Sequence, residues 1–148
     1  MTTSDLDVAR DRLRELDLTL VVVKNQDVLF GSRSRGVKSF LEAIDQLGDQ
    51  LENASVADKV VGRAVALLCV YSHVGSVYGG ILSRAAEVLL DENGVHIESD
   101  VIVDRILNMD RTDVCPFERL IGEIREPKVA YRILAQFCSR DGSSKFKG

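Results

Sequence analysis

The chain has 148 residues, a length that suits one folded domain and argues against a second core. Its formal net charge of -4 gives no electrostatic reason to expect nucleic acid or a membrane surface as a partner, because such partners usually need a basic face. The polar amino terminus, the lack of a long apolar run and three widely spaced cysteines predict a cytoplasmic protein with reduced thiols.

The first part of the chain predicts a helix, a hairpin and a second helix. Apolar residues amid alternating charges indicate an amphipathic helix over residues 6–16. Two strands, residues 18–24 and 28–33, follow it and are joined by a short turn, which is typical of an antiparallel hairpin. A helix over residues 36–47 then ends at Gly48 and places four apolar side chains on one face: Val37, Phe40, Leu41 and Ile44.

Residues 54–71 carry their polar side chains at the front and are almost wholly apolar afterwards. Ser55 followed by Asp58 has the spacing of a capping box, so we expect a central helix to begin near Ser55. Lys59 and Arg63 would then lie one turn apart, where two cations repel each other and oppose the helix dipole. An anionic ligand would relieve both effects. The apolar remainder predicts a helix packed between other layers.

The segment after the central helix predicts a parallel crossover. Residues 76–82 read as a strand, Ser83 caps a helix that runs to about Leu90, and another strand begins at Val95. With the hairpin at one edge, this strand-helix-strand unit predicts a mixed sheet covered by helices.

Two prolines mark the start of the last two predicted helices. Pro116 suits the first turn of a helix that runs to about Arg125, and Pro127 suits the first turn of a helix that runs to about Phe137. The remainder, residues 139–148, has too little apolar material to fold and is expected to be disordered. We therefore expect a single α/β domain over residues 1–138.

Three stretches make the chain resemble a small domain family of unknown function with a cytidine deaminase-like fold. They are residues 55–62, residues 35–38, and Cys115-Pro116 together with Glu118. The resemblance implies a three-layer α/β/α sandwich with a mixed sheet. It also implies a pocket where the central helix and the helix after Ser83 begin, but it implies no activity.

The chemistry of zinc deaminases is not expected here. Such enzymes need a His or Cys ligand with a nearby Glu at the start of one helix and paired cysteines at the start of the next. The predicted helix starts, residues 56–59 and 82–86, supply neither a thiolate nor an imidazole. His96 and Glu98 have the H-x-E spacing but lie in a predicted strand, so we expect no zinc and no other cofactor.

The remaining candidates each have a functional and a structural interpretation. In the structural interpretation, Asp58 is a helix cap, and Lys59 and Arg63 form salt bridges with carboxylates such as Glu52. In the functional interpretation, the three residues belong to an anion site. Beyond the end of a strand, however, a helix amino terminus favours phosphate. Two further pairs of residues add to this site. Gly79-Gly80 indicates either a bulge or the close approach of a ligand, and Ser55 and Ser83 lie at the predicted helix starts.

Cys115 and the turn before the second helix complete the candidate residues. A thiol at a helix amino terminus can be a stabilised thiolate, although a Cys between Val114 and Phe117 also suits a small buried side chain. Glu118 has the spacing to complete a capping box with Cys115. Arg35 belongs to a basic turn that suits either a phosphate clamp or solvent, and residues 110–113 suit the far wall of a pocket.

These features predict binding of a nucleotide or related phosphate-bearing small molecule by a deaminase-like domain without a zinc site. A regulatory role is one form that this function could take. Ser55, Lys59, Arg63, Arg35, Gly79, Gly80 and Ser83 are the expected ligand-binding residues. The alternatives are a zinc-independent enzyme, in which Asp58 or Cys115 supplies acid-base or nucleophilic chemistry, and a protein-interaction module. A homo-oligomer is compatible with each of the three.

Overall fold

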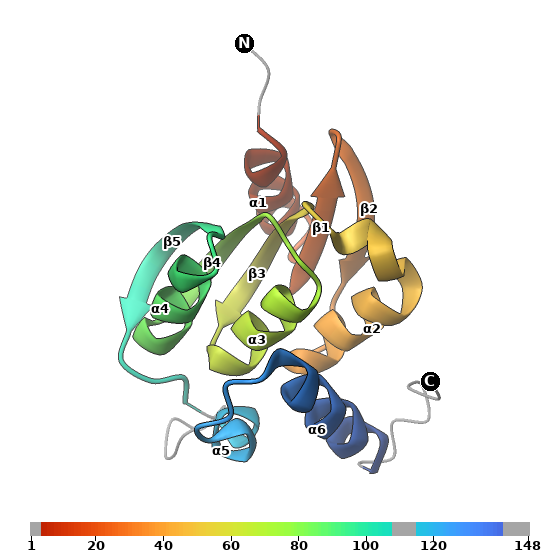
Figure 1. Ribbon diagram of the computed structural model, residues 1–148. Coiled ribbons are helices and arrows are strands. Elements are labelled where there is room, and N and C mark those ends of the chain that lie inside the picture. Colours follow the sequence, from red (N-terminus) through yellow and green to blue (C-terminus); the bar gives the residue numbers. More distant parts are fainter. Residues whose placement is uncertain (1–3, 108–114, 141–148) are drawn as a thin grey trace.

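The computed structural model describes residues 4–107 and 115–140 of the chain. They form a five-stranded mixed sheet with helices on both faces, which is the predicted three-layer α/β/α sandwich (Figure 1). The strand order is β2-β1-β3-β4-β5. No helix within the described ranges is long and apolar enough to cross a membrane.

The predicted hairpin forms one edge of the sheet. Strands β1 (Leu20–Lys24) and β2 (Asp27–Ser32) pair antiparallel. Asn25 and Gln26 join them with φ values of 54° and 68°. Two consecutive residues at positive φ are typical of the two-residue turn whose twist matches a hairpin. The predicted turn is therefore confirmed, with Asp27 already in the second strand.

The other three strands run parallel to one another. They are β3 (Ser55–Val61), β4 (Ser76–Ser83) and β5 (His96–Val103). β3 lies between β1 and β4, antiparallel to the first and parallel to the second. The predicted crossover from β4 through a helix to β5 is confirmed by their parallel register. The carboxyl ends of these three strands consequently meet at one edge of the sheet.

One face of the sheet is covered by α1 (Asp5–Glu15). Its apolar side packs on alternate residues of three strands, in a cluster of Leu6, Ala9, Leu13, Leu18, Val21, Val23, Ala57 and Tyr78. At its carboxyl end, the Arg14 guanidinium donates to both the Tyr78 hydroxyl and Asp100. These bonds tie the helix to β4 and β5.

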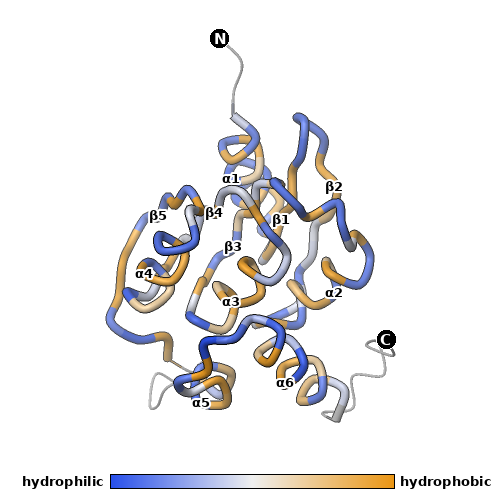
Figure 2. Tube along the Cα trace, viewed as in Figure 1, coloured by the Kyte–Doolittle hydropathy of each residue, from blue (hydrophilic) through white to orange (hydrophobic). Residues whose placement is uncertain are grey.

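The opposite face is covered by α2 (Val37–Leu47), α3 (Arg63–Tyr71) and α4 (Arg84–Glu92), and η1 (Gly48–Leu51) follows α2. α3 lies at the centre of this layer and is apolar after its first residue, Arg63 (Figure 2). α5 (Pro116–Ile121) and α6 (Pro127–Arg140) pack against α3 on its outer side. α3 is thus enclosed by other elements, as its composition predicts.

The prediction that the central helix begins near Ser55 is wrong. Residues Ser55–Val61 form the central strand β3, and the helix begins only at Arg63 after Gly62. The capping-box spacing misled because Asp58 serves another purpose: its Oδ1 accepts a hydrogen bond from the Val60 amide, two residues further along the same strand. Pairing with β1 and β4 on both sides decides the conformation of this short segment.

The last two helices differ from their predicted bounds. α5 ends at Ile121 rather than near residue 125. The next residue, Gly122, has a φ of 53°. α6 continues to Arg140, so the first two residues of the predicted tail are helical. Residues 141–148 lie outside the described part of the chain.

Candidate functional site

A pocket of about 640 Å³ lies where the carboxyl end of β3 meets the starts of α2, α3 and α5. Its polar lining comes from Thr19, Arg35, Lys38, Asp58, Lys59, Cys115 and Glu118. Its apolar lining includes Val37, Val60, Val65, Ile106, Leu107 and Phe117. A pocket of this size, mostly apolar with a few converging polar groups, has the character of a small-molecule site.

Asp58 is the most unusual polar residue of this pocket. The residue is only 5% exposed. Oδ1 accepts a hydrogen bond from the Val60 amide at 3.1 Å, and among the residues that the structure describes the buried Oδ2 has no hydrogen-bond partner. Burial raises the pKa of the Asp58 carboxyl to about 7, although backbone amides work in the opposite direction. Such a group changes protonation near neutral pH, which is the property required of an acid-base residue.

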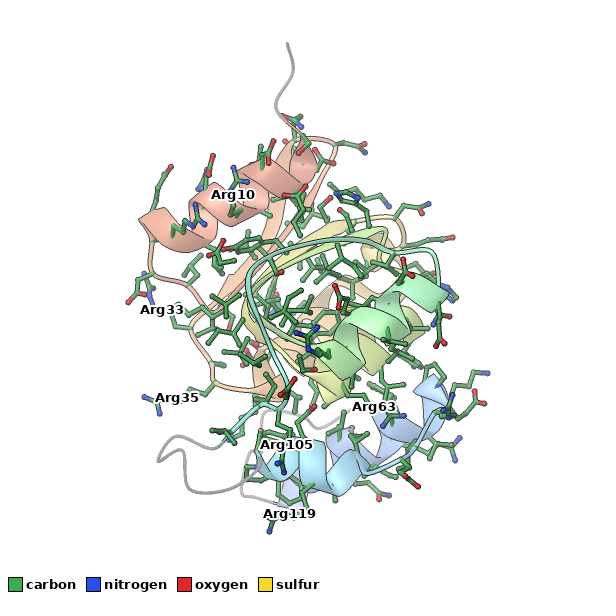
Figure 3. All side chains as sticks on the ribbon, turned by 90° about the vertical axis from the view of Figure 1, so that its left-hand side faces the viewer. Arg10, Arg33, Arg35, Arg63, Arg105 and Arg119 are labelled. Carbon is green, nitrogen blue, oxygen red and sulfur yellow. The ribbon has the colours of Figure 1, made fainter. Side chains whose placement is uncertain are left out.

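The cations of the pocket lie on the side of α2 and the end of β3. The Lys59 ammonium is 2.6 Å from Asp17, and this bond lowers the pKa of the Asp17 carboxyl. Arg35 lines the rim and extends outward into solvent (Figure 3). Lys38 belongs to the first turn of α2. Lys59 and Arg63 are not one turn apart on a helix, so the predicted repulsion between them does not arise.

The two main helices that begin at the pocket have very different amino termini. α2 begins after Gly36 with no side-chain cap from the described part of the chain, and its first turn has no acidic residue. The amino terminus of α3 is already filled by Glu118 of α5, which accepts from the backbone amides of Arg63 at 2.7 Å and Ala64 at 2.8 Å. The place for an anion predicted at the central helix is therefore taken by a carboxylate of the protein itself.

Arg63 takes part in the same connection but not in the pocket. Its guanidinium donates to the carbonyl of Gly122 at 2.7 Å and to the carbonyl of Ile124. In Figure 3 it reaches toward the C-terminal helices. Arg63 and Glu118 thus hold α3 and α5 together. The predicted capping box between Glu118 and Cys115 is wrong, because Glu118 caps α3 instead.

Cys115 is brought into the pocket with Asp58. It holds the predicted position before Pro116, but its side chain makes no capping hydrogen bond to the short helix α5. Cys115 is half-buried, whereas Cys69 and Cys138 are fully buried. Burial, and secondarily the nearby charge of Asp58, raises the pKa of the Cys69 thiol well above its ordinary value.

This difference in exposure predicts selective alkylation. In the folded protein, iodoacetamide should modify Cys115 at least about tenfold faster than Cys69 or Cys138, because a thiol must reach the reagent as its thiolate. Peptide mass spectrometry over a time course measures the three rates, and labelling in denaturant supplies the reference. Equal rates in the folded state would contradict the placement of Cys115 in an open pocket.

Five of the predicted ligand-binding residues do not line the pocket: Arg63, described above, and the four that follow. Ser55 is at the opposite end of β3, where its hydroxyl lies 2.6 Å from that of Ser76. Ser83 caps α4 by accepting from the Ala86 amide. A Cβ on Gly80 would lie 2.9 Å from the carbonyl oxygen of Lys59, and one on Gly79 would lie 3.0 Å from Val61. The glycine pair therefore allows close packing against β3.

Of the two helix starts that correspond to the deaminase motif, the first differs from the expected one and the second is as expected. With β3 assigned, they are residues 61–65 and 82–86, and neither contains a cysteine or histidine. His96 and Glu98 are hydrogen-bonded neighbours on exposed β5. Across the described ranges, no three His, Cys, Asp or Glu side chains are grouped to hold a metal ion. Residues 110–113, predicted as the far wall of the pocket, lie outside the described residues.

Sequence reasoning missed three contributors to this site: the amino terminus of α2, Glu118 as a cap for α3, and Phe117, which packs against Gly36. The first had a signal, because Gly36 is followed by a helix whose first turn has Lys38 and no carboxylate. The other two depend on contacts between residues more than fifty positions apart, which no local spacing reveals.

Comparison with known proteins places the chain among domains without an assigned function. The model of the family TM1506, a domain of unknown function (DUF1893), matches residues 8–138. The crystal structure of the DUF1893 family protein TM1506 from Thermotoga maritima is similar with a TM-score of 0.83 and 27% identity, over 93% of this chain and 92% of that one. No functionally curated protein matches.

A more distant structural likeness concerns the fold alone. Acinetobacter baumannii RibD is similar with a TM-score of 0.50 and 16% identity, over 66% of this chain and 36% of that one. This likeness is consistent with the mixed-sheet α/β architecture described above.

Proposed function

Because the chain belongs to the DUF1893 family of domains of unknown function, we propose a function from its own pocket: it binds a nucleotide or related phosphate-bearing metabolite on a deaminase-like scaffold. One observation carries the proposal. A single pocket combines apolar walls, the buried carboxyl of Asp58 and a cationic side formed by Lys38, Lys59 and the uncapped start of α2.

One part of this pocket suits the phosphate of such a ligand. A phosphate is favoured beside the amino terminus of α2, where backbone amides and the helix dipole add to the charge of Lys38. The pocket lies at the carboxyl end of β3, the usual place for ligands in an open α/β sheet. Arg35 stands at the rim, where it adds positive charge.

A thermal-shift and calorimetric comparison tests the anion site. Inorganic phosphate and ribose 5-phosphate should stabilise the wild type by mass action. The variant Lys38→Ala should bind ribose 5-phosphate about tenfold to a hundredfold more weakly, the range that corresponds to one charge-assisted hydrogen bond of about 1.5 to 3 kcal/mol. Lys59→Ala should weaken binding less, because Asp17 already neutralises this ammonium in the free protein.

The control is Lys128→Ala, which removes an exposed lysine on α6 and changes the net charge equally. Its affinity should equal that of the wild type. The proposal would be abandoned if no phosphate-bearing probe stabilised the protein, or if Lys38→Ala and Lys128→Ala behaved alike.

A second candidate function is a zinc-independent enzyme, favoured by the pKa of about 7 for Asp58 in a pocket that also contains Cys115. Asp58 would exchange a proton with a bound substrate, and Cys115 would supply a nucleophile. Turnover of a bound compound that is lost in Asp58→Asn, with binding retained, would separate this candidate from simple binding.

A further inference from the structure

The unpartnered oxygen of Asp58 indicates what the other end of a ligand must offer. A buried polar atom without a partner is uncommon in native proteins and costs stability. Oδ1 is already engaged by the Val60 amide, while Oδ2 has no partner within the described residues. A group that donates hydrogen bonds to Oδ2 would remove this cost when it binds.

Two other polar side chains of the pocket, Thr19 and Glu118, already have hydrogen-bond partners. The Thr19 hydroxyl is occupied, since it lies 2.9 Å and 2.7 Å from the carbonyl oxygens of Ser32 and Ser34. Glu118 is occupied by the amino terminus of α3. The surrounding walls are apolar, with Val65 and Phe117 among them, and such walls suit a flat ring.

We propose that the pocket selects an amino-bearing nucleobase: the base enters between the apolar walls, donates its N–H groups to Asp58 and leaves its phosphate beside Lys38. This inference rests on the proposed function and specifies its ligand. The carboxylate accepts from the exocyclic amino group, and from an adjacent ring N–H where the base has one, as guanine does. Hypoxanthine keeps the ring N–H but lacks the amino group, so it offers the carboxylate one hydrogen bond fewer than guanine, and uracil presents a carbonyl oxygen where cytosine offers its amino group.

Two matched nucleotide pairs test the inference by isothermal titration calorimetry with the full chain. GMP and IMP differ only by one amino group, whereas UMP has a carbonyl and a ring N–H where CMP has an amino group and an unprotonated ring nitrogen. At pH 8, above the pKa of about 7, the Asp58 carboxyl is ionised. In the wild type, at least one amino-bearing nucleotide should bind tenfold or more tightly than its partner.

The variant Asp58→Asn supplies the discriminating result. It is almost isosteric and keeps an oxygen for the Val60 amide, so the fold should persist, and circular dichroism checks this. In this variant, the two nucleotides of each pair should differ in affinity by about threefold or less. Its affinity for ribose 5-phosphate should stay within about threefold of that of the wild type. Asp27→Asn, an exposed carboxylate on β2, should keep the preference.

The outcomes separate this inference from the proposed function. If ribose 5-phosphate binds through Lys38 but neither nucleotide pair is discriminated, or if Asp58→Asn discriminates as well as the wild type, the inference is overturned and the phosphate site stands. If no phosphate-bearing probe binds, both are overturned.

Discussion

Asp58→Asn should remove a loss of stability that the wild type suffers as the pH rises. Urea unfolding followed by circular dichroism at pH 5, 6, 7 and 8 measures the free energy of unfolding of both proteins. We expect the difference between them to change by about 3 kcal/mol from pH 5 to pH 8, in favour of the variant at the higher pH.

The sign follows from the direction of the pKa shift. Burial raises the pKa of the Asp58 carboxyl from 3.8 to about 7 in the folded protein. Between these values the folded state binds a proton that the unfolded state has released, so stability falls as the pH rises and levels off above the folded-state pKa. Asparagine has no proton to lose in this range and therefore removes this slope.

Several neighbouring groups act on the same carboxyl and must be kept unchanged. Cys69 of α3 interacts with this carboxyl electrostatically. The other ionisable or charged residues that line the same pocket are Lys59, Arg35, Lys38, Cys115 and Glu118. Asp27→Asn, which removes an exposed negative charge, controls for net charge. Parallel pH profiles for wild type and Asp58→Asn would show that Asp58 is not perturbed by burial.

Most of the architecture could be predicted from the sequence because local signals agree with the tertiary fold. The expected roles are found for the hairpin turn, for Gly48 after α2, for Ser83 before α4 and for the two prolines that begin α5 and α6. Each is a residue whose own backbone or side-chain chemistry fixes a boundary. The parallel crossover follows from the order of the elements alone.

The failure at β3 has a physical cause in the same terms. Ser55 and Asp58 have the spacing of a helix start, while Val56, Val60 and Val61 favour a strand, and a seven-residue segment is too short for periodicity to decide. Two neighbouring strands supply the pairing that decides it. That error placed Arg63 in the predicted site.

The candidate site was consequently predicted in part. Asp58, Lys59, Arg35 and Cys115 line one pocket, although β3 rather than a helix presents the first two. A helix start and a strand end both lie near the edge of the sheet, so a residue wrongly assigned between them still reaches the right region. A carboxylate from α5, that of Glu118, binds the amino terminus of α3. This contact joins residues far apart in the sequence, so no local sequence pattern predicts it.

The largest effect on stability away from Asp58 should come from this contact. Glu118→Ala leaves the amides of Arg63 and Ala64 without their acceptors, and removes a negative charge from the amino terminus of a central helix. We expect a loss of about 2 to 3 kcal/mol in the free energy of unfolding. Glu118→Gln keeps one acceptor and should lose less, and Glu123→Ala, an exposed glutamate just beyond α5, should be nearly neutral.

Gly62→Ala provides an independent approach to the same contact, because an added Cβ would lie 2.7 Å from the Glu118 carboxylate. Gly62 has a φ of -100°, which alanine adopts without strain, so the cost of the substitution must come from displacing Glu118. We expect Gly62→Ala to cost about 1 to 2 kcal/mol alone and close to nothing in the Glu118→Ala background, where the reduced entropy of the unfolded chain even favours alanine. Chemical unfolding of the two single variants and the double variant completes the cycle. Additive costs would mean that the carboxylate moves aside freely, and that α3 and α5 are held together by Arg63 and apolar packing rather than by Glu118.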